Sequence, residues 1–477
     1  PEKIGGWVPE STNTYAGVCR SLWNWVTLAG ENLVGVGTNL QFYIMNGGAY
    51  YDITPIRDTT TLTSPFTATD GSSVIQVYDV AHGCNDGDYV IFSGDGITGL
   101  GGNVTAAVLT GTFQIAYLNA DNYSITVSVT ANATDAAGSP GGGTVVTQYE
   151  VNTGPSYQVP LVGWGAGPWG YGGWGIGQPT NTAGLQLWSQ ANFGEDLIYG
   201  PKGQGIYYWN ASTGYTPLQV TISISTPGVI TLPVGFSISD GTALSLTSTG
   251  HLPTGLSVGT VYFVVGSSSN TFSLATSIGG TPINTTGTQA GLQYISQRGV
   301  NLADAGDADT PLFQYDLLVS DASRFILVFG TNDYGQDYLD PMLIRWSNQE
   351  DPYTWTPDAT NQAGSIRLSR GSRIVTALQT RQEIVTFTDS ALYSLQYVGP
   401  PYVWSSQLLG DNISIIGPNA VALASGIVYW MGRDKFYMYN GNVSTLNCDL
   451  RRYVFQDFNT LQPQQVYAGT NEQFNEV

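Results

Sequence analysis

The sequence is poor in the residue types on which most metal sites and many active sites depend. It holds three cysteines and two histidines among 477 residues. Cys19, Cys84 and Cys448 lie far apart, and together with His82 and His251 they match no zinc-binding spacing and no disulfide framework. Motifs for a serine nucleophile elbow, a phosphate loop or a dinucleotide-binding loop are missing. Both histidines are therefore expected to be structural or exposed rather than catalytic.

Basic residues are also scarce. Fifteen Lys and Arg stand against 35 Asp and Glu, which gives a formal net charge of −20. Sequence-independent affinity for nucleic acid comes from Lys and Arg that displace counterions, and no basic stripe is present to do so. An acidic surface would repel DNA, which suits a passage for DNA better than a DNA-binding protein.

The sequence contains no signal peptide, no membrane-spanning run and no long segment of helical periodicity. It has 60 glycines and 23 prolines, with runs rich in Thr, Ser, Val, Ile and Tyr. These features predict many short strands and tight turns, and hence an all-β protein. Because the chain starts at Pro1 without Met and stops at Val477, we expect it to be a fragment of a longer polypeptide.

A strand–turn–strand unit recurs along the chain, at residues 33–53, 196–218, 325–346, 383–395 and 426–446. Each unit alone would leave one apolar face in water, and radial packing of such units, as in a β-propeller, buries those faces. An ordinary β-sandwich is the alternative. The first three units are separated by more than a normal loop, which favours a propeller with insertions.

A second repeat fills these gaps, in residues 63–150 and 219–296. In each copy an Asp-Gly pair, Asp86-Gly87 or Asp240-Gly241, precedes alternating apolar residues, and two further strand patterns follow in the same order. Asp-Gly pairs form tight turns readily. We therefore predict two copies of one small β-domain, inserted into a propeller platform formed by residues 1–62, 151–218 and 297–477.

The segment from Gly163 to Gly177 alternates glycine with large aromatic residues. Glycine frees the backbone, and Trp164, Trp169 and Trp174 each offer a large apolar area with one N–H donor. This pattern indicates contact with another subunit or a partner protein, because exposed indoles without a partner are unfavourable. A disordered linker is the alternative.

Several groups of carboxylates are candidates for metal or catalytic sites. Asp304, Asp307 and Asp309 are a weak calcium candidate, because the loop lacks the ordered glycine and terminal glutamate of an EF-hand, and a solvated loop is the alternative. A second such cluster is formed by Asp333, Asp337 and Asp340. Asp389 and Asp434 are the acids that a propeller glycosidase would use if they converged. The prediction is that there is no catalytic residue, no bound metal and no cofactor.

Three phrases carry a family resemblance: residues 344–355 (IRWSNQEDPYTW), 388–401 (TDSALYSLQYVGPP) and 430–441 (WMGRDKFYMYNG). They resemble the tail nozzle proteins, or tail tubular protein B-like proteins, of short-tailed bacteriophages, and the Gly/Trp segment is similar too. The resemblance is strongest over 325–477, weaker over 1–62, and only architectural across the two insertions. It implies a β-propeller subunit with added domains, and six copies in a ring beneath an adaptor protein.

The expected function is therefore that of a structural virion protein of the phage tail. Its partners would be further copies in a homohexameric ring, the adaptor (connector) protein, tail fibre or spike proteins and the host cell envelope. Double-stranded DNA would pass during ejection without specific binding, since six copies at −20 give about −120 before screening. The alternatives are a propeller-based host-glycan-binding protein or depolymerase, and an extracellular adhesion module.

Overall fold

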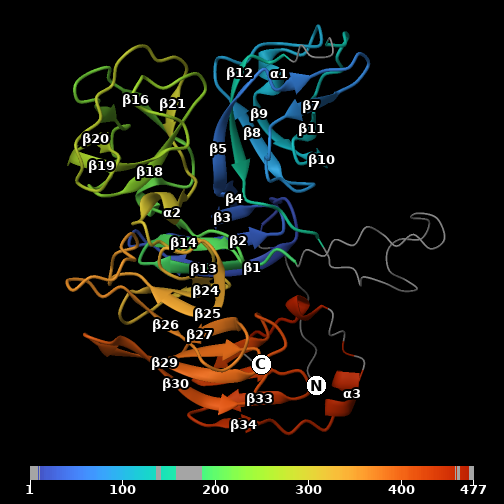
Figure 1. Cartoon of the computed structure of the whole chain (residues 1–477), viewed down its shortest axis with the longest axis vertical. Helices are drawn as coiled ribbons and strands as arrows, with labels where there is room; N and C mark the ends of the chain where they lie inside the picture. The colour runs from blue at the N-terminus through green and yellow to red at the C-terminus, as the bar shows by residue number, and fades with distance from the viewer. Residues whose placement is uncertain are drawn as a thin grey trace, which may run out of the picture. The chain divides into compact units, whose positions relative to one another are not determined.

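The computed structural model describes residues 9, 11–135, 141–156, 185–456, 458, 462–471 and 477. Over these residues the chain is almost entirely β, as predicted (Figure 1). The helices are short: α1 (Ala106–Leu109), α2 (Leu302–Ala305), α3 (Arg451–Gln456) and the 3-10 turns η1 (Ala211–Thr213) and η2 (Pro463–Gln465). In the described part of the chain, none is long and apolar enough to cross a membrane.

Five sheets have four antiparallel strands in the order expected of propeller blades. In four of them each strand lies beside the next one along the chain, and in the second sheet an insertion separates the third strand from the fourth. The first is β1 (Cys19–Val26), β2 (Asn32–Thr38), β3 (Phe42–Asn46), β4 (Ala49–Asp52). The second is β13 (Trp188–Phe193), β14 (Asp196–Pro201), β15 (Tyr207–Trp209), β22 (Val300–Asn301). The other three are β23 (Asp316–Val319), β24 (Ile326–Asn332), β25 (Leu339–Trp346), β26 (Gly364–Arg367); β27 (Ile374–Gln379), β28 (Ile384–Thr388), β29 (Ala391–Gly399), β30 (Val403–Asp411); and β31 (Val421–Ala424), β32 (Ile427–Met431), β33 (Phe436–Tyr439), β34 (Val443–Thr445).

The predicted hairpins are present in all five sheets. In the first sheet, the turn between β3 and β4 is made by Gly47 and Gly48, whose φ values of 57° and 80° suit glycine best. One predicted strand was wrong. Residues 215–218 do not complete the second sheet, because β16 (Leu218–Ile222) instead begins the second insertion. The fourth strand is β22, which follows that insertion.

The chain divides into two compact units. One comprises residues 1–154, 194–198 and 207–305, and the other comprises residues 155–193, 199–206 and 306–477. The first sheet is thus grouped with both insertions. In the second unit, the sheets β23–β26, β27–β30 and β31–β34 follow one another (Figure 1). One apolar cluster around Phe329 and Trp404 joins the first two of these sheets, and another around Phe387 and Trp430 joins the last two. Face-to-face burial of successive sheets is how propeller blades are stabilised.

Each insertion encloses its own apolar core, one centred on Phe66, Phe92 and Tyr123, the other on Leu246, Val264 and Phe272. The first insertion has two sheets, in the orders β5-β12-β8-β9 and β10-β11-β7-β6. Their strands are β5 (Ile56–Thr63), β6 (Phe66–Thr67), β7 (Val74–Tyr78), β8 (Tyr89–Ser93), β9 (Gly111–Gln114), β10 (Ala116–Asn119), β11 (Asn122–Thr126) and β12 (Thr144–Glu150). The first strand therefore starts at Ile56, seven residues before the predicted boundary.

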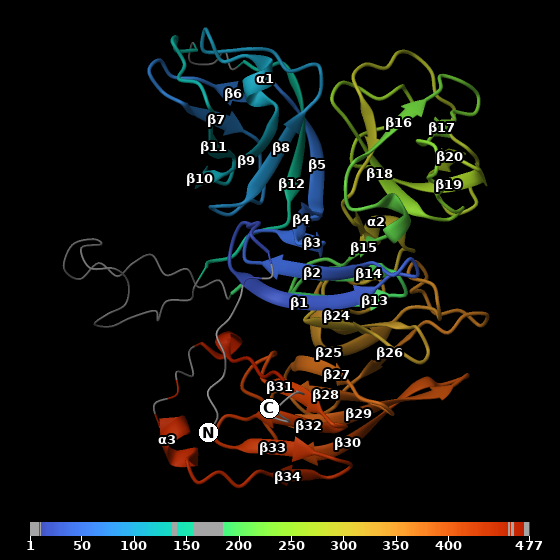
Figure 2. The same cartoon turned by 180° about the vertical axis from the view of Figure 1, so that it is seen from behind.

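The second insertion is a closed barrel in the order β16-β17-β20-β19-β18-β21 (Figure 2). Its remaining strands are β17 (Ile230–Thr231), β18 (Ala243–Ser248), β19 (Val261–Ser268), β20 (Thr271–Ala275) and β21 (Gln293–Ile295). The long strand β19 pairs with β18 at its start and with β20 at its end. In the first insertion, β9 pairs with β8 and β10 pairs with β11, so these two strands together occupy the place of β19.

The two insertions therefore share one pairing scheme, with β5 and β6 together corresponding to β16. The two Asp-Gly turns are also equivalent. The Gly87 amide donates to the Ile115 carbonyl at 2.9 Å, and the Gly241 amide donates to the Val264 carbonyl at 2.8 Å. Both glycines have positive φ, at 90° and 84°. Each Asp-Gly turn precedes a strand, β8 in the first insertion and β18 in the second, and does not connect two paired strands.

Candidate functional site

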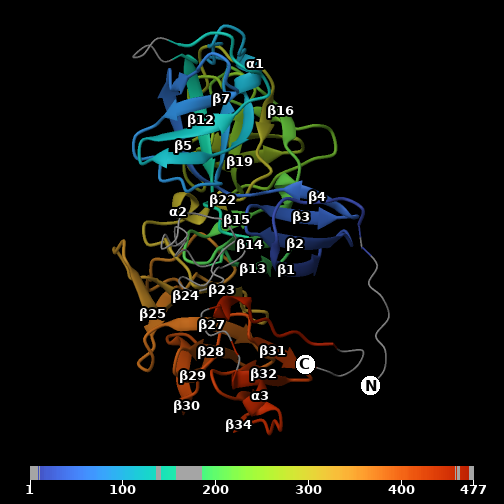
Figure 3. The same ribbon diagram turned by 90° about the vertical axis from the view of Figure 1, so that its right-hand side faces the viewer.

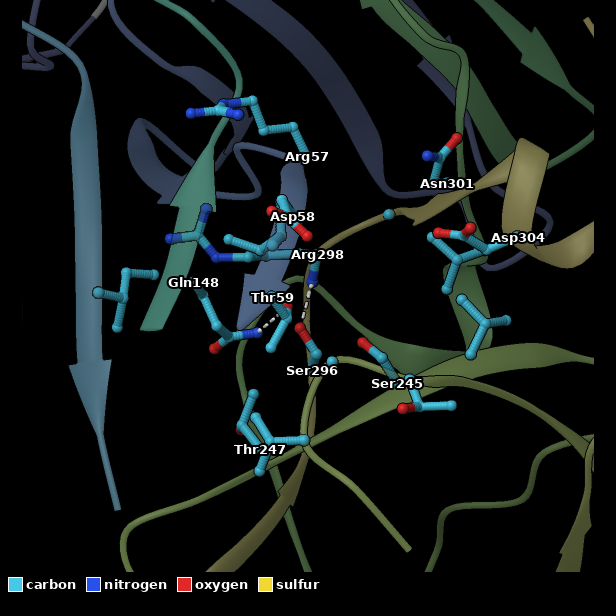
Figure 4. Close-up of a pocket in the computed structure, with 18 of the residues that line it drawn as sticks. Arg57, Asp58, Thr59, Gln148, Ser245, Thr247, Ser296, Arg298, Asn301 and Asp304 are labelled. Carbon is cyan, nitrogen blue, oxygen red and sulfur yellow. Dashed lines mark hydrogen bonds between the residues drawn. The ribbon is translucent and has the colours of Figure 1, made fainter. Parts of the chain in front are cut away.

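A polar cavity of about 640 Å³ lies within the first unit, between the two insertions. Figure 4 shows Asp58 and Thr59 of β5 with Gln148 of β12 on one side, and Asn301 and Asp304 on the other. Ser245 and Thr247 of β18 lie below them. The residues lining this cavity include no aromatic side chain. It therefore offers hydroxyls, amides and carboxylates, but no aromatic platform on which a sugar ring could stack.

The guanidinium of Arg57 is held inside the first insertion, directed away from the cavity (Figure 4). Its Nη2 atom donates to the His82 carbonyl at 2.8 Å and lies 3.0 Å from the Cys84 sulfur. The same group lies 5.2 Å from the centre of the Tyr149 ring, within cation–π range. This cation therefore stabilises the base of the insertion.

The second arginine, Arg298, joins the end of the first sheet to both insertions. Its Nη2 atom donates to Asp52 at 2.9 Å and to Glu150 at 2.8 Å, and Nη1 donates to the Thr54 carbonyl. Asp52 ends β4, Glu150 ends β12, and Arg298 follows β21. We call Arg298, Asp52 and Glu150 the root cluster, because they hold together the two ends of one insertion and the returning end of the other.

The root cluster is an ionic group shielded from water. The Glu150 side chain is fully buried, and that of Arg298 is almost so. Burial raises the pKa of the Glu150 carboxyl, because it penalises the charged form; Arg298 opposes this effect and Asp52 adds to it. One guanidinium thus serves two carboxylates, and the cluster carries an excess of negative charge.

The cavity itself is acidic. Asp58 and Asp304 are exposed, whereas both arginines are engaged elsewhere. Burial raises the pKa of Asp304, and the charge of Asp58 raises it further. Such a cavity favours neutral polar or cationic groups over phosphate.

The predicted metal candidates hold neighbouring loops in place. Asp307 Oδ2 accepts from the backbone amides of Trp355 and Thr356, both at 2.8 Å. Asp309 accepts from the Gly335 amide at 3.0 Å and from the Thr356 hydroxyl at 3.0 Å. No group of three or more His, Cys, Asp or Glu side chains in the described residues is arranged to hold a metal ion. Asp304 instead belongs to the cavity described above.

The second acidic cluster is equally engaged in local contacts. Asp333 Oδ1 accepts from the Tyr334 amide at 2.8 Å, and Asp340 forms an ion pair with Arg367 at 2.6 Å. The carboxylates of Asp333 and Asp340 thus bind different partners and do not converge on one point, as the oxygen ligands of a calcium ion would.

The two candidate glycosidase acids, Asp389 and Asp434, make local structural contacts. Asp389 accepts from the Ser372 amide at 2.8 Å and from its hydroxyl at 2.5 Å. Burial alone would raise the pKa of Asp389, but these hydrogen bonds outweigh it and lower the pKa. Asp434 forms an exposed ion pair with Arg451 at 2.9 Å. A general acid needs a raised pKa, so the environment of Asp389 does not suit that role.

The two histidines differ in their surroundings. His82 is buried, with Nε2 2.9 Å from the Asn119 carbonyl and Nδ1 accepting from the Cys84 amide at 3.1 Å. His251 is more exposed and lies 2.7 Å from Asp95. Trp164, Trp169 and Trp174, the predicted contact residues, lie outside the described residues.

The root cluster was missed at the sequence level. Arg298 and Glu150 are 148 positions apart, and no local pattern joins them. The available signal was the position of Arg298, a scarce basic residue directly after the predicted end of the second insertion at 296.

No protein-family model and no curated protein matches the chain. Among solved structures, it is similar to the phage phi92 endosialidase at 12% identity, covering 87% of this chain and 52% of that one, with a TM-score of 0.21. It is also similar to Citrobacter koseri AztD at 10% identity, covering 88% and 92%, with a TM-score of 0.23. The chain thus spans about half the length of the endosialidase. TM-scores this low carry no argument, and the fold assignment depends on the sheets themselves.

Proposed function

We propose that this chain is a structural subunit of the tail nozzle of a short-tailed bacteriophage, and not an enzyme. It would assemble as a homohexameric ring, dock to the adaptor protein, carry fibre or spike proteins at its sides and conduct genomic DNA during ejection. The phrases that carry the family resemblance include buried core positions such as Ile344, Leu392 and Trp430. The resemblance therefore supports a shared fold first, and the function through that fold.

One observation carries the proposal: the buried charged groups connect structural elements instead of gathering around a reactive centre. The root cluster does this in the first unit. In the second unit, Asp316 Oδ1 accepts from Ser189 at 2.9 Å and from Lys202 at 2.6 Å. Its Oδ2 accepts from the Thr376 hydroxyl at 2.7 Å and from the Ala377 amide at 3.1 Å. One carboxylate thus links strands of different sheets, which is expected in a subunit that must keep its shape in an assembly.

A further carboxylate, Glu383, repeats this arrangement. It accepts from the Tyr439 hydroxyl of the fifth sheet at 2.6 Å and from the Ser394 hydroxyl of the fourth sheet. Together these two hydrogen bonds join the fourth and fifth sheets. Rigid fixing of sheet to sheet supports a passive structural role, because an enzyme concentrates such groups where substrate can reach them.

Light scattering on the purified chain, alone and with its adaptor, tests this proposal. The expected mass is about six times the 50.9 kDa of one chain. Replacing Trp164, Trp169 and Trp174 with Ala is expected to weaken assembly while the thermal unfolding profile stays unchanged. A monomer under all conditions that releases reducing sugar from host polysaccharide would refute the proposal.

The second candidate, a glycan-binding protein or depolymerase, is favoured by one feature of the cavity. Asp304 has a raised pKa beside the charge of Asp58, which is the pattern of an acid and a carboxylate in glycosidases. The missing aromatic platform argues against it. Loss of sugar release in Asp304→Asn, with the fold intact, would favour this candidate over the nozzle.

A further inference from the structure

Strand β1 lies at the edge of the first sheet (Figure 3), and apolar side chains on and just beyond it are exposed. Leu22 and Val26 are 63% and 58% exposed, and Leu28, just beyond the strand, is 92% exposed. Leu22 and Val26 are four residues apart on a strand, so they lie on the same side of the sheet. We call Leu22, Val26 and Leu28 the β1 surface.

The opposite side of β1 carries Trp23, which is 41% exposed, and Trp25, which packs inside the unit. Trp25 points the other way, is 5% exposed and donates from its indole nitrogen to the Glu195 carbonyl at 2.9 Å. Its ring meets that of Trp209 edge-on, with centroids 6.4 Å apart. The exposure of Leu22 and Val26 is therefore not a sign of a loosely packed strand, since their neighbour on the same strand is firmly buried.

Natural edge strands are usually protected by proline, lysine or a bulge that prevents association. β1 has eight residues, contains no proline or lysine, and has Arg20 as its one charged residue. Its pairing with β2 shifts register between Cys19 and Ser21, but residues 21–26, which carry Leu22 and Val26, pair without a bulge. An apolar stretch of this kind at a sheet edge is expected to be covered by a protein partner.

The charge pattern identifies that partner as another copy of the chain. Each copy carries −20, so two copies repel wherever their carboxylates meet. Residues 12–30 contain no Asp or Glu, which leaves β1 as a place where two acidic molecules can approach. Glu195 borders the surface at its far end, where its carboxylate accepts from the Leu28 amide. A charge-depleted apolar centre with charged residues at the rim is the usual anatomy of a protein interface.

We propose that the β1 surface is a subunit contact, buried by a second copy of this chain. The inference rests on the self-assembly proposed above and adds the surface that mediates it. Because a ring needs two different surfaces on each subunit, β1 would meet a different part of the neighbouring copy rather than its β1.

The experiment compares the self-association of variants of the full chain by light scattering over a range of concentrations. The double variant Leu22→Ser/Val26→Ser is expected to weaken association about tenfold or more, because truncating central apolar residues has the largest effect on an interface. Leu28→Ser is the second test variant, since its side chain is almost fully exposed and its replacement leaves the fold untouched. It is expected to weaken association in the same direction.

The matched control is Val74→Ser/Tyr78→Ser on β7. These residues are also four apart on a strand and 46% and 57% exposed, but they lie between Asp70 and Asp79. The control is expected to associate like the unchanged chain. If the unchanged chain assembles and the two β1 variants associate as strongly as the unchanged chain and the control do, the β1 inference is wrong while the nozzle proposal stands. If the unchanged chain is monomeric at every concentration, both alone and with its adaptor, both proposals are wrong.

Discussion

Removing Arg298 should open the junction between the two insertions. In Arg298→Met, the aliphatic part of the side chain is kept, but the donors to Asp52, Glu150 and the Thr54 carbonyl are lost. Glu150 then remains fully buried, with a 3.4 Å contact from Gln41 as its remaining side-chain hydrogen bond. Leaving a buried charge without its partner costs about 3–5 kcal/mol.

Glu150 can reduce this cost by binding a proton, so the effect depends on pH. Its pKa is already raised by burial, and loss of Arg298 removes the opposing effect. An acid whose folded pKa is above its unfolded pKa binds more protons in the folded state. Stability from this group is therefore greatest below the unfolded pKa and falls as pH rises toward the folded pKa, by up to about 1.4 kcal/mol per pH unit. Arg298→Met should be least stable at alkaline pH.

Hydrogen exchange is the suitable assay, because unfolding of a chain with several domains is not two-state. Amides of β5, β12 and β21 report local opening of the junction. A loss of about 3 kcal/mol corresponds to exchange about 150-fold faster in these strands. Adding Glu150→Gln to the variant should recover most of the loss, since the buried charge is then gone. Unchanged exchange in Arg298→Met, or no recovery in the double variant, would refute the role given to the root cluster.

Three further predictions follow from single contacts. In Gly259→Ala, the new Cβ would clash with the Thr59 side chain, its hydroxyl oxygen most closely, at a φ of +75°. A destabilisation of about 1–3 kcal/mol should appear in thermal unfolding, with partial recovery in Gly259→Ala/Thr59→Ala, which removes that oxygen. Asp316→Ala leaves Lys202 without its carboxylate and should cost about 3 kcal/mol, whereas Asp434→Ala, at an exposed ion pair, should cost less than about 1 kcal/mol in the same denaturation experiment. The folded pKa of Asp389 is lowered, so its contribution to stability is present above the unfolded pKa and is lost as pH falls through the folded pKa. Ser372→Ala removes one of the hydrogen bonds that lower this pKa and should raise the pKa of Asp389 in an NMR titration. An unchanged titration would contradict the contact.

The hairpins were predictable because their signals are local. Alternating apolar residues and glycine turns such as Gly47-Gly48 determine β3 and β4 without help from distant parts of the chain. The strand β22 has no such signal, because it consists of two residues, Val300 and Asn301. It forms where the chain returns from the second insertion and pairs with Tyr207 and Tyr208 of β15. Its pairing depends on tertiary structure and could not be found in the sequence pattern.

The candidate site was less predictable for the same physical reason. Asp307 and Asp309 drew attention because they are close in sequence, yet their oxygens accept from loop amides and a hydroxyl. Glu150 and Arg298 are far apart in sequence and lie 2.8 Å apart in the fold. Sequence proximity identifies a loop, whereas a buried ion pair requires knowledge of which strands meet.

The distribution of acids also changes how the charge of −20 should be interpreted. Asp52, Glu150, Asp316 and Glu383 accept hydrogen bonds from groups in other elements, and Glu150 has a raised pKa. Lys202 offsets the charge of Asp316, and Arg298 offsets one of the two charges of Asp52 and Glu150, so these acids add less to the field that DNA in a proposed channel would meet than their number suggests. The repulsion of one copy by another, and of DNA by the ring, must then come mainly from exposed acids. Salt screens this repulsion beyond about 10 Å at 0.1 M ionic strength. If subunits meet at an acid-free surface such as β1, added salt should strengthen ring assembly rather than weaken it. Weaker assembly at high salt would instead indicate that ion pairs hold the ring together.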